Sequence, residues 1–230
     1  MSASSHYLDV DIDETMTAIV EWERHDATHY LTEPDYKTED IMLKSRFRAK
    51  NPCTLFELRF LLKLKGLDTM SNVFIQIKPS PIVSFDFTFA AKAPVAAQEK
   101  LNCNTLLLLG FHLNETLNVL VPVAAKDLLP LTRVQLGKVL DALRMLSKVT
   151  SFSIYIESIK LPKAKLQAIT DAVTLGRLKS FRYQERLKRM YHGTGAKVAG
   201  LSTRVEDAPP LYNETEPPLL IAPIDDKKRR

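Results

Sequence analysis

The sequence predicts an α+β fold, with an antiparallel β-sheet or sandwich followed by C-terminal helices and a disordered C-terminal tail. Three observations lead to this class. Residues 54–89 hold three strand-like runs in succession, other strand-like runs lie on both sides of them, and helical periodicity dominates later in the chain. Strands grouped first and helices grouped later are typical of α+β proteins.

The stretch at residues 54–89 alternates apolar and polar side chains. In its first run the apolar face holds Phe56, Leu58, Phe60, Leu62 and Leu64. The run at residues 73–77 is β-branched and ends before Pro79, and the third run places Val83, Phe85, Phe87 and Phe89 on one face. A period of two fits only a strand, so we predict an antiparallel meander with one buried face.

Two strands are predicted before this meander. Residues 17–24 and residues 41–48 alternate in the same way, and the polar segment between them, residues 25–40 with Pro34, is predicted to be a loop. The turn signal Asn51-Pro52 separates the second strand from the meander.

After the meander, residues 90–103 are predicted to form a loop or a short helical turn. Two further apolar runs, residues 105–113 and residues 117–121, flank Asn114-Glu115, so they are predicted to pair as a hairpin that Pro122 closes.

Helical spacing begins at residue 133. The apolar side chains of a helix predicted at residues 133–148 recur every three or four positions: Val134, Leu136, Val139, Leu140, Leu143 and Leu146. A strand at residues 151–157 follows, then a helix that starts after Pro162 and is interrupted by Gly176, and then a basic segment.

These elements divide the chain into three parts. We predict a flexible acidic arm at residues 1–15, a single domain at residues 16–198 and a disordered tail at residues 199–230. Within the domain, residues 16–123 are rich in strands, and residues 131–191 are helical with one strand.

The net charge of +5 conceals an asymmetry along the chain. Residues 1–40 carry eleven acidic side chains against two basic ones, whereas residues 158–190 carry nine basic side chains against two acidic ones. A basic region of this kind contacts a polyanion or the acidic part of the same fold.

The composition favours a location inside the cell. The chain begins without the basic and apolar regions of a signal peptide, and no apolar run is long enough for a membrane span. We therefore predict a protein of the nucleus or cytoplasm that is not secreted, with Cys53 and Cys103 as free thiols in preference to a disulfide. The sequence does not predict the oligomeric state.

The best linear motif is Pro209-Pro210-Leu211-Tyr212, which fits the Pro-Pro-any-Tyr pattern bound by WW domains. Consecutive prolines hold the backbone near the polyproline II conformation at little entropic cost, and aromatic grooves accept them. The hypothesis is a WW-domain ligand in which Pro209, Pro210 and Tyr212 contact the partner. The alternative is a proline-rich spacer.

Two basic features complete the candidate sites. Lys227, Lys228, Arg229 and Arg230 predict a nuclear-import signal or polyanion contact, with a solubilising end as the alternative. The segment at residues 177–189 predicts nucleic-acid contact, because Phe181 and Tyr183 are interleaved with its basic side chains. These basic side chains are Arg177, Lys179, Arg182, Arg186, Lys188 and Arg189. The alternative is a solvated helix face whose aromatic side chains pack on the sheet.

No pattern predicts a catalytic, metal-binding or cofactor-binding site. His25 and His29 are spaced like paired helical ligands, but they fall in a predicted loop with no third ligand. A glycine is required at the sixth position of a calcium loop starting at Asp9, and Glu14 stands there instead.

Four features mark the C-terminal third: LQAITDAVTLG at residues 166–176, MYHGTGAKV at residues 190–198, APPLY at residues 208–212 and the Lys/Arg-rich end. In these features the chain resembles uncharacterised filamentous-fungal proteins. The resemblance implies no activity and adds no catalytic residue.

The sequence thus predicts a non-enzymatic interaction protein that presents a WW-domain ligand and a basic terminus from a flexible tail. The first alternative is a nucleic-acid-associated nuclear protein that uses residues 177–189. The second alternative is an enzyme whose site is assembled from residues far apart in the sequence.

Overall fold

The computed structural model describes residues 11–31, 40–64, 67, 69–90, 94–101, 105–125, 134–181 and 183–200. The strands in these residues are β1 (Ile12–Arg24), β2 (Ala27–Leu31), β3 (Met42–Arg48), β4 (Cys53–Lys63), β5 (Met70–Ile77), β6 (Ile82–Ala90), β7 (Leu106–Leu113), β8 (Asn118–Pro122), β9 (Ser151–Glu157), β10 (Lys179–Ser180) and β11 (Ala196–Val198). The helices are α1 (Val95–Leu101), α2 (Val134–Leu146), α3 (Lys163–Thr174) and α4 (Tyr183–Arg189), with 3-10 turns η1 (Ser158–Lys160) and η2 (Tyr191–Gly193).

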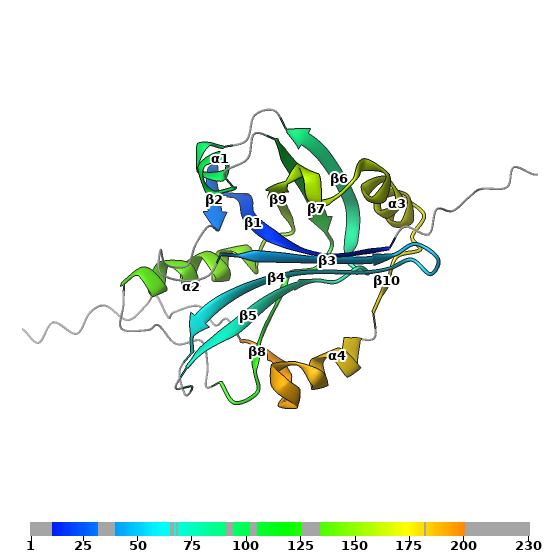
Figure 1. The fold of residues 1–230 in the computed structure, drawn as a ribbon. Coiled ribbons are helices and arrows are strands. Elements are labelled where there is room, and N and C mark those ends of the chain that lie inside the picture. Colours follow the sequence, from blue (N-terminus) through cyan, green and yellow to red (C-terminus); the bar gives the residue numbers. More distant parts are fainter. Residues whose placement is uncertain are drawn as a thin grey trace, which may run out of the picture.

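The predicted α+β class is wrong, because the described residues form mainly one large β-sheet with short helices around it (Figure 1). The eleven strands of the described part join in the order β11-β8-β5-β4-β3-β1-β9-β7-β6, with β2 beside β1 and β10 beside β4. All pairings are antiparallel except that of β10 with β4. The later part of the chain returns to this sheet through β9, β10 and β11, so its helices form no separate layer.

Strand β1 joins the two halves of the sheet. Its first part pairs with β3, from Ile12 opposite Phe47 to Thr17 opposite Met42. From Ala18 onward β1 pairs with β9, and its end also pairs with β2. The strand predicted at residues 17–24 is confirmed, and it starts earlier than predicted, at Ile12, within the segment predicted as an arm.

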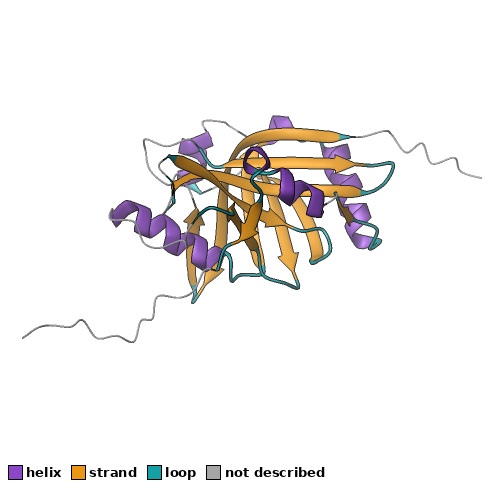
Figure 2. Ribbon diagram, turned by 90° about the horizontal axis from the view of Figure 1, so that it is seen from below, coloured by secondary structure: helices purple, strands orange, loops and turns teal. Residues whose placement is uncertain are grey.

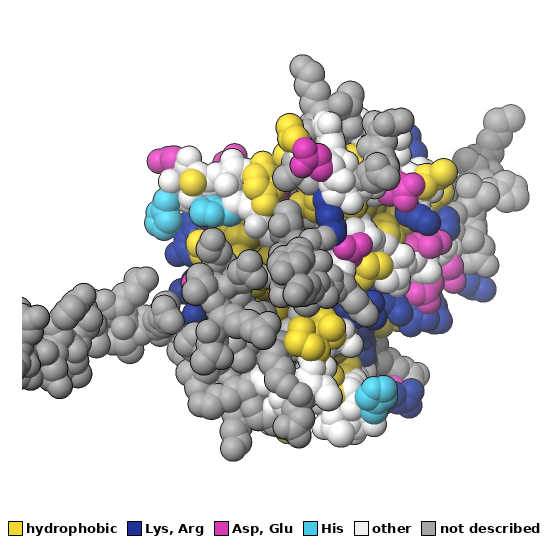
Figure 3. Space-filling view, turned by 60° about the vertical axis from the view of Figure 1, so that its left-hand side comes forward, with side chains coloured by type: hydrophobic (Ala, Val, Ile, Leu, Met, Phe, Trp, Pro, Cys, Tyr) yellow, Lys and Arg dark blue, Asp and Glu magenta, His cyan; other side chains and the backbone are white. Residues whose placement is uncertain are grey.

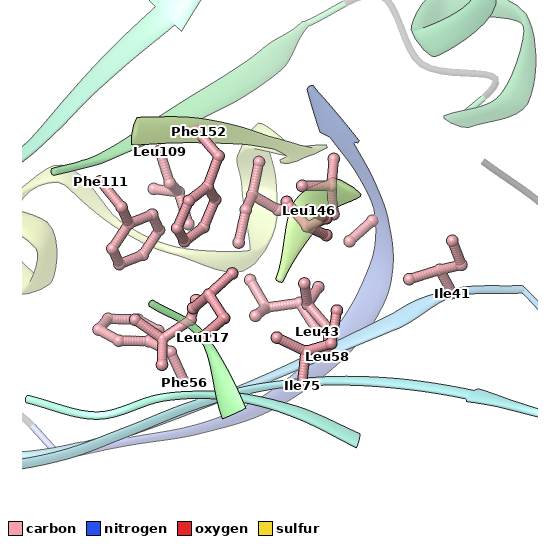
Figure 4. Close-up of a cluster of buried hydrophobic side chains, with 14 of the residues drawn as sticks. Ile41, Leu43, Phe56, Leu58, Ile75, Leu109, Phe111, Leu117, Leu146 and Phe152 are labelled. Atoms are coloured by element: carbon pink, nitrogen blue, oxygen red, sulfur yellow. The ribbon is translucent and has the colours of Figure 1, made fainter. Parts of the chain in front are cut away.

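The two halves of the sheet face each other across the core. Phe56 on β4 lies 5.7 Å from Phe85 on β6 and 5.2 Å from Phe111 on β7, measured between ring centroids. Figure 4 shows Phe111 and Phe152 on one side of this core and Phe56, Leu58 and Ile75 on the other. Burial of this apolar surface is the main term that holds the two halves together.

The apolar face predicted for residues 54–65 is confirmed. Phe56, Leu58, Phe60, Leu62 and Leu64 are all buried. The opposite face of β4 is also covered in part, because Leu55 and Glu57 are buried there.

The predicted meander is only half right. β4 and β5 are antiparallel neighbours, but β5 then pairs with β8, while β6 leaves to pair with β7 in the other half of the sheet. Pro79 and Pro81 lie in the connection, which carries the chain across the core instead of turning it back on itself. Alternation identifies strands but does not specify their partners.

The third strand of the predicted meander also has a shift in register. Val83 is 56 % exposed, whereas the prediction placed it on the buried face with Phe85. The irregularity lies between Ile82 and Ser84, so Ile82 takes the buried position and the alternation is lost at this point.

Two connections differ from the prediction. The strands at residues 105–113 and 117–121 exist as β7 and β8, but they do not form a hairpin, because β7 pairs with β6 and β9 and β8 pairs with β5 and β11. The predicted loop after residue 24 contains β2, which folds back on β1 through His25 and Asp26 at positive φ. Aspartate and histidine enter this left-handed region more readily than most residues.

The predicted helices are confirmed in outline, and α1 confirms the helical turn predicted within residues 90–103. Val139, Leu140, Leu143 and Leu146 of α2 are buried, as their spacing predicts. Pro162 precedes α3, and Gly176 follows its last turn at φ +59°, where residues with a Cβ are disfavoured.

The chain after α3 connects the two halves on the outside of the molecule. It runs from α3, which packs against β6, past the turn between β3 and β4 as β10, and on to α4 (Figure 1). In the view from below, a short helix lies over the strands (Figure 2), where contacts of Arg186 and Tyr191 place α4 and η2 against β4, β5 and β8.

Candidate functional site

The strongest linear motif lies outside the described residues. Pro209, Pro210 and Tyr212, the basic cluster at residues 227–230 and the rest of the predicted tail from residue 201 all belong to this part of the chain. Their roles stay predictions from the sequence.

The predicted basic segment is split into parts with different surroundings. Arg177 is exposed just before β10 and Lys179 is exposed in β10, and Lys188 and Arg189 are exposed on the last turn of α4. Arg182 lies outside the described residues. The described part of the segment therefore does not form one uniform basic helix.

Arg186 turns inward, unlike its basic neighbours on α4. Its Nη2 donates hydrogen bonds to both carboxylate oxygens of Glu57, on the outward side of β4. The Glu57 side chain is 3 % exposed and that of Arg186 is 25 % exposed. The guanidinium therefore holds α4 on the sheet, and Arg186 is a poor candidate for the predicted nucleic-acid contact.

The ionisation of Glu57 reflects its burial. Loss of hydration raises the pKa of this carboxyl above its ordinary value, and the positive charges of Arg186, Lys44 and Arg59 oppose that rise. A polar residue on the outward face of a strand predicts exposure, so the sequence alone does not reveal this pair.

Tyr191 makes a second attachment next to this ion pair. Its hydroxyl lies 2.8 Å from the carbonyl oxygen of Asn72 and 3.1 Å from that of Leu120, and its ring packs edge-on against Phe74. Burial, followed by the charge of Glu57, raises the pKa of Tyr191. The phenol therefore remains a hydrogen-bond donor at neutral pH.

Another part of the basic segment meets a distant strand. The guanidiniums of Arg46 and Arg48, on β3, lie 5.3 and 5.5 Å from the ring centroid of Phe181. Across the sheet, Arg48 pairs with Cys53 and Cys53 pairs with Lys179, which places Arg48 and Lys179 on either side of β4. The structure thus brings basic residues of β3 and β10 to one end of the sheet.

Alternation in the sequence indicates that Arg46 and Arg48 share the polar face of their strand. It does not indicate that this strand lies near residues 177–181. Only the parallel pairing of β10 with β4, a strand of two residues, makes the connection.

No family model, curated protein or solved structure matches this chain.

A cleft of about 250 Å³ lies where β1 passes from β3 to β9. Its lining includes Thr17, Lys100, Glu157 and Lys160. The ammonium of Lys100 forms an ion pair of 2.6 Å with Asp40, to which the hydroxyl of Thr17 also donates a hydrogen bond. Burial lowers the pKa of Lys100. Charges of both signs line the cleft, and the ion pair of Lys100 with Asp40 lies beside it.

A polar row crosses the outer face of the other half of the sheet. Nδ1 of His112 lies 2.7 Å from Oγ of Ser151, and Ser84 pairs with His112 from the other neighbouring strand. Both side chains of this pair are on the solvent side of the sheet, so it has the arrangement of a surface hydrogen bond. Among the described residues, no group of three or more His, Cys, Asp and Glu side chains is placed to hold a metal ion.

Two further features concern the helices and the cysteines. No helix in the described part of the chain is long and apolar enough to cross a membrane. Cys53 is a half-buried free thiol, and Cys103 lies outside the described residues.

One face of the molecule shows basic, acidic and hydrophobic side chains interspersed, with Lys and Arg in a band across the right-hand half of the view (Figure 3). On this face the basic side chains are interspersed with acidic ones, so a contact with a polyanion here depends on which basic side chains stand together.

Proposed function

We propose that the protein is a non-enzymatic interaction protein that binds a WW-domain partner through Pro209, Pro210 and Tyr212. The observation that carries the proposal is the motif itself, which follows the last described strand, β11, in the sequence. In this arrangement the sheet is the scaffold and the motif is the recognition element.

The chemistry of the motif supports this division. The two prolines have fixed φ values and lose little entropy when an aromatic groove takes them. The tyrosine ring fills a second pocket, and its hydroxyl forms a hydrogen bond at the solvent-exposed edge of that pocket. Leu211 is the variable position and needs no specific contact.

The test is a titration of the full-length protein against a panel of isolated WW domains. We expect saturable binding to at least one domain, and loss of that binding in Tyr212→Ala. Leu211→Ala is the matched control, because it changes the neighbouring position and leaves the pattern intact. Equal binding by all three proteins, or no binding to any domain, would rule the proposal out.

The proposal also includes a role for the basic cluster at residues 227–230. A run of Lys and Arg is the type of signal that import receptors bind. We expect a fluorescent fusion to concentrate in the nucleus and to lose this concentration when the four residues are replaced by Ala. An unchanged distribution would remove nuclear import and leave the WW-domain contact unaffected.

A further inference from the structure

We propose that the end of the sheet near the β3–β4 turn binds the phosphodiester backbone of single-stranded nucleic acid. We call this surface the basic ridge. It consists of Arg46, Arg48, Lys50, Arg177 and Lys179. It goes beyond the proposed function, because it uses different residues and a different partner.

The basic ridge is assembled from parts of the chain that are far apart in the sequence. Arg46 and Arg48 stand on the same side of β3, separated by two residues, which is about 7 Å along a strand. Lys50 follows in the turn, and the β10 pairing adds Lys179 on the far side of Cys53. Arg177 precedes Lys179 by two residues in the sequence.

The positive side chains of the ridge face water. Arg48, Lys50, Arg177 and Lys179 are exposed, and 40 % of the Arg46 side chain is exposed. Asp13 lies 3.0 Å from Nε of Arg46 and also pairs with Lys44, so one carboxylate offsets part of this charge. Most of the positive charge of the ridge is left for an external anion.

Phe181 holds two of the guanidiniums in place. Arg46 and Arg48 both lie over its ring, and such contacts favour a fixed orientation of the planar groups. An ordered guanidinium loses less entropy when it forms a bidentate contact with phosphate. Its outer face also offers a surface on which a base can stack.

These features favour nucleic acid over an anionic membrane. The cations line the narrow end of a sheet, and they include three guanidiniums, two of them ordered on an aromatic ring. A polymer with regularly spaced phosphates and flat bases can contact both the line of cations and the ordered guanidiniums. A protein that binds a membrane surface typically has a broad basic face with apolar anchors.

The test measures binding of labelled oligothymidine to the full-length protein by fluorescence anisotropy between about 50 and 200 mM salt. We expect affinity to fall with salt. Arg48→Ala combined with Lys179→Ala should weaken binding at low salt and reduce the slope of log K against log salt by about 1.4, because each lost phosphate contact of a single strand accounts for about 0.7.

Lys148→Ala combined with Lys197→Ala is the matched control. Both lysines are exposed, and the pair removes the same charge away from the ridge. The control should keep the slope of the wild-type protein. Lys188→Ala combined with Arg189→Ala should also keep it, which would separate the ridge from helix α4.

Phe181→Leu tests the positioning role of the aromatic ring. It leaves every charge in place, so we expect weaker binding with an unchanged salt slope. Absence of binding at low salt, or equal slopes for the ridge and control double variants, would overturn the proposal. Binding to phosphatidylserine vesicles without binding to the oligonucleotide would also overturn it, in favour of a membrane contact.

Discussion

The carboxylate of Glu57 and the guanidinium of Arg186 form an ion pair although 129 residues separate them in the sequence. The pair joins helix α4 to the outward side of β4, opposite the main core. It lies beside the Tyr191 hydroxyl, which bonds to backbone carbonyls of the sheet. Electrostatic and hydrogen-bond contacts thus attach the end of the described fold.

We expect Arg186→Ala to lower the free energy of unfolding by about 3 kcal/mol, because removing one partner leaves a buried carboxylate unpaired. Lys188→Ala is the control, since this side chain is exposed on the same helix and its loss should change stability by less than about 0.5 kcal/mol. Urea unfolding of the two variants gives the comparison. Similar losses for both would show that the ion pair contributes nothing specific.

Glu57 also predicts a dependence of stability on pH. Its ordinary pKa of 4.5 is raised in the folded protein by burial. At any pH between the ordinary pKa and the raised pKa, the folded state binds more protons than the unfolded chain. The contribution of Glu57 to stability therefore falls as pH rises through this range. Relative to Glu57→Gln, the wild-type protein should therefore lose stability from pH 4.5 upward until the raised pKa is passed.

Urea titrations of both proteins across this range measure the difference. A difference that is flat with pH would mean that the two states of the chain titrate alike at this position. A difference that grows with pH would mean that the pairing with Arg186 outweighs the loss of hydration.

Phe111 should be among the most sensitive positions of the core. Its ring contacts those of Phe56, Phe85 and Phe152, and so it links both halves of the sheet. We expect Phe111→Ala to cost about 3–5 kcal/mol, as is typical of buried aromatic residues. Phe89 is 45 % exposed, so Phe89→Ala should lower the free energy of unfolding much less. Calorimetric unfolding of both variants and the wild-type protein measures the difference. Equal shifts in Tm would contradict the conclusion that Phe111 lies in the core and Phe89 does not.

The sequence predicts most strands of this fold and few of their partners. The alternation around Phe56 and Leu58 follows from local chemistry, so it is visible in one chain. The pairing of β9 with β1 joins residues more than a hundred positions apart in the sequence, and the α+β prediction failed there. Short strands such as β10 and β11 have no periodicity to detect.

The candidate sites show the same limit. The motif around Tyr212 is contiguous and therefore visible in the sequence. The basic character of residues 177–189 is visible too, but the sequence does not separate Arg186, which bonds to Glu57, from Lys179, which is exposed beside β4. Only the pairing of strands brings Arg48 to Lys179.

Gly110 on β7 leaves no room for a side chain. It pairs with Asp86 on β6, and a Cβ added to Gly110 would clash with Oδ1 of Asp86. We expect Gly110→Ala to force the carboxylate aside and to lower the free energy of unfolding by about 1 kcal/mol. In the background of Asp86→Ala the clash is absent, so the same change should be neutral or stabilising, because alanine reduces the entropy of the unfolded chain.

A double-mutant cycle measured by urea unfolding gives the coupling between the two sites, which should be about 1 kcal/mol. Additive effects of the two changes would mean that the Asp86 side chain does not occupy the space above Gly110.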